Sequence, residues 1–457
     1  MKRTGPLLVV AFILVVVLLF LGSAVVYGSY DKGPRTTTEV LLNQENGTYM
    51  KVIHVVVRGG TEEEIGYELG KVGIEEFNSI LLPFDDPVYG EEKEQYIKGY
   101  DEDLYERVQG VKQAYQLGED NYSYDASFPF YVGGIPLCSA IYFPPVSTED
   151  GHAIAGRNMD WHYNSDHDEF TDVTDLSLFT NNTDINDEKF DELLADRIGT
   201  LAQVVQVVEI YPDEGYATLV IGTMDLLTGV VDGLNEKGLY VASLQDGDTY
   251  TDAFSDLAGF TSTRLNYMQV LGSILEHCAN VEEAKQWLAN SQVIMPFMGV
   301  HFLICDDSGA ATVAEYDDES HELIFTDYQD TAVPLTNYAI CLKPDISQYP
   351  PEKPNDAHDD YLRSAKLHDY ISDHEGAFTT DDAWDAMEMV EANADLSSEE
   401  ILAGENETDR LLWTVVTDLT DRSMTVKFIL KDGPINNETY RTHDLVLSEP
   451  FTFKLER

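Results

Sequence analysis

The sequence predicts an α+β protein in which blocks of antiparallel strands are layered against helices. From about residue 202 onward, short β-branched runs at 204–210, 216–221, 229–231 and 239–244 alternate with turn sequences, as is typical of antiparallel strands. Helical patterns flank these runs: Asn280 caps one helix, and 361–371 and 380–392 indicate two more. Two hairpins are expected, 300–305 with 311–316 and 411–419 with 424–430. Strand blocks beside helix blocks give a layered α+β domain.

Residues 1–30 are expected to be a membrane segment that precedes this domain. Lys2 and Arg3 come before an apolar run that is long enough to cross a bilayer. A signal anchor is favoured over a cleaved signal peptide, whose core is usually shorter. With the basic end inside, the catalytic body would lie outside the cell in either case. It would be anchored at the extracellular face of the cell membrane or secreted. Residues 31–51 indicate a short polar linker.

Residues 52–137 start with a strand-like run at 55–58 and continue with helical material. Thr61 is a suitable N-cap for a helix whose first turn is acidic, and 91–117 has helical spacing. Taken alone, this stretch is a helical subdomain.

The chemistry is predicted to centre on Cys138. A cysteine is a nucleophile as thiolate, so it needs a base or a positive neighbour. Residues 139–155 indicate strand, tight turn, strand, which would bring Arg157 and Asp160 back beside Cys138. If the chain were cut before Cys138, the new α-amino group, with an ordinary pKa near 8, could act as the base for its own side chain.

The same residues carry a resemblance to a known family. Cys138-Ser, a hairpin and Gly156-Arg-Asn-Met-Asp-Trp161 resemble the start of the mature chain in the choloylglycine hydrolase, acid ceramidase and isopenicillin N acyltransferase group of N-terminal-nucleophile hydrolases. Asp232-Gly-Leu-Asn-Glu-Lys-Gly resembles a second family segment, and Leu335-Thr-Asn337 and Tyr361-Leu-Arg363 are weaker matches. The resemblance spans roughly residues 52–453. It departs from the family pattern in having Cys-Ser rather than Cys-Thr and a slightly longer hairpin.

The resemblance implies both a fold and a mechanism. The fold would be an αββα four-layer sandwich with two stacked antiparallel sheets. Residues 52–137 would be a small chain that stays bound after self-cleavage, and 138–457 the catalytic chain. The chain would hydrolyse linear amides, or transfer their acyl group, through an acyl-enzyme on Cys138. In that mechanism Asn235, together with Asn337, stabilises the oxyanion, Asp160 positions the α-amine, and Arg157 and Arg363 favour the thiolate.

Residues 163–199 are dense in acids and turn formers and indicate an inserted surface loop. His162, Asp166, His167 and Asp168 offer metal-ligand chemistry, but they lack a regular ligand spacing. A solvated acidic loop is the preferred interpretation, so no metal is predicted.

Composition narrows the choice of partners. A net charge of -55 argues against nucleic acid or an anionic membrane face. No phosphate loop or dinucleotide fingerprint occurs, so no organic cofactor is expected; the partner would be a small-molecule N-acyl amide. Three cysteines besides Cys138, at 278, 305 and 341, leave one unpaired, so no disulfide framework is expected. Two alternatives stay open: an inactive membrane-tethered binding protein, and a papain-like peptidase, which would need a base histidine.

Overall fold

The computed structural model describes residues 33–43, 50–84, 86–131, 137–164, 169–170, 204–249, 263–295, 299–317, 319–349, 360–392, 407–435 and 443–456. The predicted membrane segment, most of the predicted insertion and the alternative metal ligands Asp166, His167 and Asp168 lie outside these ranges. No helix in the described ranges is long and apolar enough to cross a membrane.

The larger sheet has nine strands in the order β1-β2-β8-β9-β10-β11-β14-β15-β16. Their bounds are β1 Arg35–Leu42, β2 Lys51–Arg58, β8 Val204–Tyr211, β9 Thr218–Gly222, β10 Val230–Asn235, β11 Tyr240–Gln245, β14 Val300–Cys305, β15 Ala310–Tyr316 and β16 Leu323–Gln329. The expected hairpin of β14 and β15 is confirmed.

The second sheet has eight strands, with the path β17-β5-β6-β18-β19-β20 and with β7 and β21 at its edges. Their bounds are β17 Val333–Leu335, β5 Leu137–Phe143, β6 Ile154–Asn164, β18 Glu407–Asp418, β19 Ser423–Ile435, β20 His443–Leu447, β7 Glu169–Phe170 and β21 Phe451–Lys454. Two predicted hairpins are confirmed here, β5 with β6 and β18 with β19. Two short pairs complete the strands: β3 Ile80–Pro83 with β4 Tyr124–Phe130, and β12 Leu265–Asn266 with β13 Val293–Ile294.

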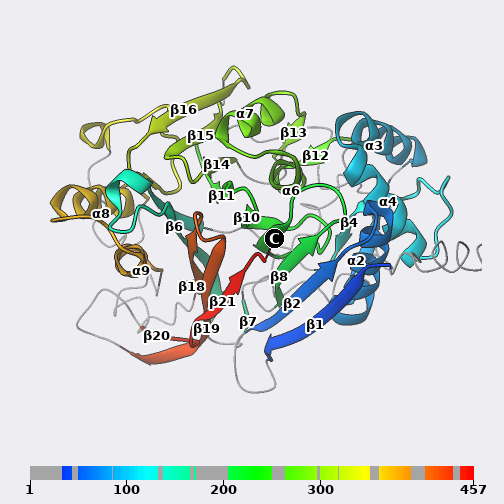
Figure 1. The fold of residues 1–457 in the computed structure, drawn as a ribbon, viewed down its shortest axis with the longest axis horizontal. Coiled ribbons are helices and arrows are strands. Elements are labelled where there is room, and N and C mark those ends of the chain that lie inside the picture. Colours follow the sequence, from blue (N-terminus) through cyan, green and yellow to red (C-terminus); the bar gives the residue numbers. More distant parts are fainter. Residues whose placement is uncertain are drawn as a thin grey trace, which may run out of the picture.

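Helices cover the outer faces of both sheets (Figure 1). The helices are α2 Glu62–Phe77, α3 Pro87–Tyr100, α4 Glu102–Ala114, α6 Tyr267–His277, α7 Val281–Ala289, α8 Asp360–Asp373 and α9 Thr380–Met389. α6 and α7 pack on the nine-stranded sheet, and α8 and α9 pack on the eight-stranded sheet. The inner faces of the two sheets share one hydrophobic core. The result is the expected four-layer arrangement.

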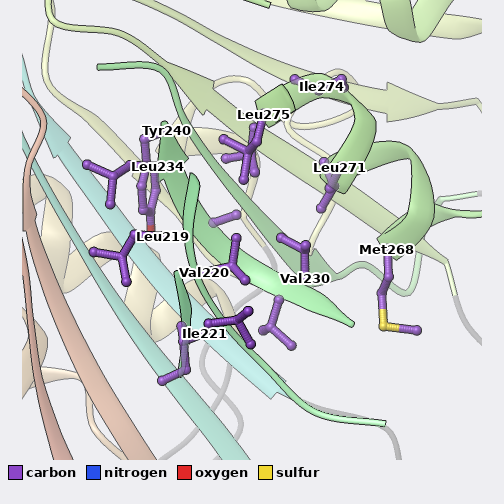
Figure 2. Close-up of a cluster of buried hydrophobic side chains, with 14 of the residues drawn as sticks. Leu219, Val220, Ile221, Val230, Leu234, Tyr240, Met268, Leu271, Ile274 and Leu275 are labelled. Carbon is purple, nitrogen blue, oxygen red and sulfur yellow. The ribbon is translucent and has the colours of Figure 1, made fainter. Parts of the chain in front are cut away.

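Figure 2 shows how α6 sits on β9 and β10. Leu271 and Leu275 of α6 lie on the face of the sheet that carries Val220, while Leu219 and Leu234 occupy the opposite face. The helix can approach because residue 233 is glycine: a Cβ there would lie 2.7 Å from Val220 Cγ1 and 3.1 Å from Leu275 Cδ1. Strand β10 is therefore held tightly between the helix layer and the inner core.

Three expectations need correction. The nine-stranded sheet is not wholly antiparallel, because β2 pairs with β8 in parallel; more than a hundred residues separate these two strands, so the connection is long enough to return in the same direction. The segment predicted as a linker contains β1, which pairs with β2. The helical stretch at 91–117 is two helices, because Asp101 ends α3 and caps α4 by accepting the backbone N–H of Leu104 at 3.0 Å.

Candidate active site

The β5–β6 hairpin places Arg157 beside the Cys138 thiol, as the sequence predicts. Ala140 pairs with Arg157 and Cys138 pairs with Met159, so these inward-facing side chains are neighbours. Arg157 Nη2 donates to Cys138 Sγ at 2.9 Å and to the backbone carbonyl of Ser243 at 3.3 Å. Both Cys138 and Arg157 are fully buried between the sheets.

Asp232 completes this group from the opposite sheet. Arg157 Nη1 donates to Asp232 Oδ2 at 3.1 Å, and both side chains are 0% exposed. The register of β10 with β9 shifts between Val230 and Asp232, directly before the carboxylate, and irregularities of this kind commonly redirect a side chain. The Trp413 ring lies 5.9 Å from the guanidinium carbon of Arg157 and adds a cation–π contact.

The surroundings pull the pKa of the thiol in two directions. Burial raises the pKa of Cys138, while the charge of Arg157 and the backbone amide of Gln245 oppose that rise. Burial also raises the pKa of Asp232 to about 7, again against the opposing effect of Arg157. The pKa of Arg157 is raised because its two acidic neighbours outweigh burial, so the guanidinium stays charged.

Asn337 and Arg363 hold the backbone of the same cysteine. Asn337 Oδ1 accepts the backbone N–H of Cys138 at 3.1 Å, and its Nδ2 donates to the carbonyl of Gln245 at 2.6 Å. Arg363 donates from Nη1 to the carbonyl of Cys138 at 2.7 Å and from Nη2 to Asn337 Oδ1 at 2.8 Å. Asp360, one turn earlier on α8, accepts from Arg363 at 2.6 Å. Residue 138 is therefore fixed at its nitrogen, its carbonyl and its sulfur.

Asp160 is close to this site along the chain but points away from the thiol. It pairs with Leu137 in the β5–β6 ladder, and its position three residues after Arg157 puts its side chain on the outer face of β6. There Asp160 Oδ1 accepts the backbone N–H of Ala392 at 3.3 Å. The side chain is buried there, and its charge raises the pKa of the Cys138 thiol.

Asn235 does not belong to the site, contrary to the sequence-based expectation. Its Nδ2 donates to the carbonyls of Leu275 and Cys278 at 2.7 and 2.8 Å, and its Oδ1 accepts the N–H groups of Lys237 and Leu239 at 3.0 and 3.1 Å. It therefore closes the β10–β11 turn and binds carbonyls at the end of α6. These hydrogen bonds are those of a turn asparagine.

Three residues at the site were missed from the sequence: Asp232, Ser243 and Gln245. The carbonyl of Ser243 and the amide of Gln245 reach the thiol because β11 lies opposite β5 in the other sheet. Asp232 had a signal, since a carboxylate between Val231 and Gly233 interrupts an otherwise apolar strand. Such a residue is rarely buried unless it is paired.

A second buried cluster lies behind the site and consists of Asp246, His301 and Glu315. His301 Nδ1 lies 3.3 Å from Glu315 Oε1 and 3.7 Å from Asp246 Oδ2, and all three side chains are 0% exposed. This ligand set is of the kind that binds metal ions. His301 Nε2, however, meets the carbonyl of Thr336 at 2.8 Å, and Glu315 accepts the N–H groups of Ile340 and Cys341. The donors and acceptors of this cluster are thus satisfied as an ion-pair network.

Comparison with protein families decides the identity of the chain. Residues 138–370 match the family described as linear amide C–N hydrolases, choloylglycine hydrolase family. The chain belongs to this family. The match begins at Cys138 and includes Arg157, Asp232, Asn337 and Arg363, so the family assignment and the geometry concern the same residues. Family membership makes the protein an amide hydrolase and confirms the resemblance inferred from the sequence.

Several solved structures are similar to this chain. A conjugated bile acid hydrolase from Clostridium perfringens has 17% identity and a TM-score of 0.41, over 70% of this chain and 97% of that one. Penicillin V acylase from Agrobacterium tumefaciens has 14% identity and a TM-score of 0.40, over 65% and 84%. An N-acylethanolamine-hydrolyzing acid amidase orthologue from Caenorhabditis elegans has 12% identity and a TM-score of 0.35, over 62% and 93%. These likenesses are too weak to add to the family match. The curated proteins contain no match.

Proposed function

We propose that the protein is a self-processing cysteine amidase that cuts its own chain before Cys138 and then attacks N-acyl amides with the Cys138 thiolate. The observation that carries this proposal is the fixation of residue 138: Asn337 binds its nitrogen, Arg363 its carbonyl and Arg157 its sulfur. A buried cysteine that serves only packing needs none of these contacts. A nucleophile whose own α-amine must act as base needs its nitrogen held in place as well as its sulfur.

Self-processing would begin with attack of the Cys138 thiol on the carbonyl carbon of Leu137. The C–N bond of the peptide breaks, a thioester forms between Leu137 and Sγ, and the nitrogen leaves as the α-amine of Cys138 with the proton lost by the thiol. Water then hydrolyses the thioester, which leaves a carboxylate on Leu137 and restores the thiol. Asn337 Oδ1 already accepts from this nitrogen in the uncut chain.

In the mature enzyme the α-amine would take the thiol proton, and the thiolate would attack the substrate carbonyl. The amine part of the substrate leaves with a proton returned by the α-ammonium group, and an acyl-thioester remains on Cys138. Water, activated by the same amine, then releases the acid. If a second amine takes the place of water, the same acyl-enzyme gives acyl transfer.

The end of β11 supplies the donor that we assign to the oxyanion. The backbone N–H of Gln245 is directed at Cys138 Sγ, and the Gln245 carbonyl is held by Asn337 at 2.6 Å. Residue 245 is thus fixed beside the attacking sulfur, and its N–H would donate to the substrate oxygen on which charge develops in the tetrahedral intermediate. Asn235 has no part in this step, because its amide is occupied at the end of α6.

The two chains made by self-cleavage would remain associated. Strand β2 of the small chain pairs along its whole length with β8 of the catalytic chain. Arg107 of α4 forms a buried ion pair with Glu276 of α6, and Gln269 donates to the carbonyl of Ser127 at 2.9 Å. Such buried pairing is costly to separate, so the 52–137 segment would act as a structural subunit.

The substrate class and the location complete the proposal. The partner would be a small N-acyl amide rather than nucleic acid, in keeping with a net charge of -55. The apolar segment within residues 1–30 would place the enzyme at the outer face of the cell membrane or release it outside the cell.

The deciding experiment is the intact mass and N-terminal sequence of the chain from residue 31, expressed as wild type and as Cys138→Ala at moderate and high salt. We expect two fragments for the wild type, the larger beginning at Cys138, and a single uncut chain for the variant. An uncut wild type under every condition would overturn self-processing and favour an inactive binding protein. A processed and fully active Cys138→Ala variant would overturn Cys138 as nucleophile.

Screening follows from that result. The processed protein would be tested against N-acyl amides of different acyl length, with and without an added primary amine. Release of free acid alone identifies a hydrolase, and formation of a new amide in the presence of the amine identifies an acyltransferase. The Cys138→Ala protein, carried through the same preparation, is the control for contaminating amidases.

A further inference from the structure

Arg157 contacts two acidic groups at once, and the mechanism above uses only one of them. Its Nη2 donates to Cys138 Sγ at 2.9 Å and its Nη1 donates to Asp232 Oδ2 at 3.1 Å. The three side chains come from β5, β6 and β10 and are fully buried. The guanidinium of Arg157 therefore lies between the Asp232 carboxylate and the thiol of Cys138.

The charges of this group do not balance when the thiol ionises. With a neutral thiol, Arg157 and Asp232 cancel. When the thiolate forms, one positive charge faces two negative charges in a buried site, and an uncompensated buried charge is costly. In the uncut chain, where residue 138 has no α-amine, the group becomes neutral again only if Asp232 takes up a proton; in the mature enzyme the α-ammonium group would be a second source of positive charge. Burial indeed raises the pKa of Asp232 to about 7 although Arg157 opposes the shift, so the carboxyl can take up a proton near neutral pH.

Other titratable groups lie near the thiol and Asp232. Asp160, on the outer face of β6, raises the pKa of the thiol through its charge, and Arg363, which binds the Cys138 carbonyl, pairs with Asp360. Burial raises the pKa values of Tyr240 and Tyr267, so both stay neutral. In the described part of the chain, Asp232 is the carboxylate that shares a guanidinium with the thiol.

We propose that Asp232 is a positioning residue that competes with the Cys138 thiolate for Arg157 and so sets the pH at which the nucleophile ionises. The proposal rests on the assigned role of Cys138 as the nucleophile. Deprotonation of Asp232 holds the thiol in its neutral form, and protonation of Asp232 frees Arg157 for the thiolate. Each ionisation raises the pKa of the other group, because both anions depend on one cation.

The test is the pH dependence of alkylation of Cys138 by iodoacetamide, followed by peptide mass spectrometry so that Cys278, Cys305 and Cys341 are counted separately. In Asp232→Asn the competing charge is gone. We expect the midpoint of alkylation to move to lower pH by about one unit, which is tenfold faster alkylation below the midpoint. The midpoint, unlike the absolute rate, does not depend on how easily the reagent reaches the buried thiol.

Asp225→Asn is the matched control. Asp225 is also fully buried and also has its pKa raised by burial to about 7, but its carboxylate binds Thr228 and the backbone of Leu227 rather than Arg157. We expect its alkylation midpoint to equal that of the wild type. If Asp232 merely anchored Arg157, Asp232→Asn would release the guanidinium and move the midpoint to higher pH; that shift, or none, overturns the proposal.

A second measurement covers the case in which Asp232→Asn does not fold. In the wild-type protein, the carboxyl of Asp232 is titrated by carbon-13 NMR before and after alkylation of Cys138. Because the thiol ionises above the range in which Asp232 titrates, we expect the Asp232 carboxyl signal to show a second inflection at the alkylation midpoint of Cys138 and to lose it after alkylation; a wild-type signal without that inflection overturns the competition. Neither measurement needs amide turnover, so a protein that shows the coupling but cleaves no amide refutes the proposed function and leaves this inference standing.

Discussion

Among the buried cations that the structure describes, Arg157 and His301 can be compared directly, because each is fully buried and lies close to two acidic groups. Arg157 lies between Cys138 and Asp232, and His301 lies between Asp246 and Glu315. Both groups are fully enclosed in the core. The two groups differ in the other hydrogen bonds that their acids accept. That difference distinguishes a group that can change its charge from one that stabilises the fold.

At His301 the backbone fixes the charges. Glu315 accepts the N–H groups of Ile340 and Cys341 at 2.7 and 2.8 Å, and its pKa is lowered because His301 and these amides outweigh burial. Burial alone would lower the pKa of His301, but Glu315 and Asp246 raise it overall. The imidazolium and the Glu315 carboxylate therefore stabilise each other's charged form, and a hydrogen-bonded network of this kind is rigid.

At Arg157 one of the two acids is a thiol, which carries no charge until it reacts. Burial raises the pKa of the thiol and the pKa of Asp232. Both acids therefore need the charge of Arg157 to stabilise their ionised forms. A change of charge is possible here and is disfavoured for the His301–Glu315 pair, although burial raises the pKa of Asp246 beside that pair. Perturbed and mutually dependent pKa values are typical of catalytic sites.

Loss of Arg157 is expected to have the largest effect. Arg157→Met removes the charge that stabilises the thiolate, and we expect turnover to fall by about a hundredfold or more. The alkylation midpoint of Cys138 should move to higher pH, because burial then acts unopposed by the guanidinium. The check is amide hydrolysis together with the alkylation profile.

The double variant Arg157→Met with Asp232→Asn separates activity from folding. In the single variant Asp232 is left without its ion-pair partner, which costs stability; the double variant removes that unpaired acid. We expect the thermal midpoint to recover and the activity to stay low. Recovered activity would mean that Arg157 serves the fold rather than the thiolate.

Replacement of His301 is expected to damage the fold more than the chemistry. His301→Asn leaves Asp246 and Glu315 facing each other without the cation, and breaking a buried charge pair in this way costs about 3–5 kcal/mol of unfolding free energy. The pKa of His301 is raised in the folded state. Its stabilisation is therefore complete below its unfolded pKa of about 6.5 and is lost as pH rises through the folded value.

The measurement is urea unfolding of the wild type and of His301→Asn, from below the unfolded pKa of histidine to above the folded pKa of His301. The difference between their unfolding free energies should be largest at the acidic end and should shrink toward alkaline pH. An equal difference at every pH would show that His301 is neutral in the fold and would remove the contrast with Arg157.

The sequence predicted the parts of this site that are local in the chain. The β5–β6 hairpin is encoded by two apolar runs and a turn, so the sequence alone is enough to place Arg157 beside Cys138. Asp246, His301 and Glu315 lie on three separate segments, and only the pairing of β11 with β14 and of β14 with β15 brings them into one cluster. Such contacts depend on the order of the strands in the sheet, and no short sequence motif predicts that order.

The structure places Asn235 and Asp160 away from the thiol, because a neighbouring part of the chain binds each side chain. Asn235 stands in an Asn-Glu-Lys-Gly turn, and the motif gave no means of telling a catalytic amide from a turn amide. The end of α6, forty residues later in the chain, occupies its Nδ2. Asp160 was placed by its distance from Arg157 in the sequence, but an interval of three residues in a strand puts the two side chains on opposite faces.

The smallest effect on chemistry is expected for Asn235, which extends the comparison to a buried polar residue that has no charge. Asn235→Ala removes two donated and two accepted hydrogen bonds and leaves the carbonyls of Leu275 and Cys278 without this donor. We expect a loss of about 1–3 kcal/mol in unfolding free energy. Turnover per folded molecule and the alkylation midpoint of Cys138 should stay within about twofold and a few tenths of a pH unit of the wild type, because Asn235 touches neither Arg157 nor the thiol. A hundredfold loss of turnover in a folded Asn235→Ala protein would return the oxyanion role to Asn235 and require the β10–β11 turn to move when substrate binds.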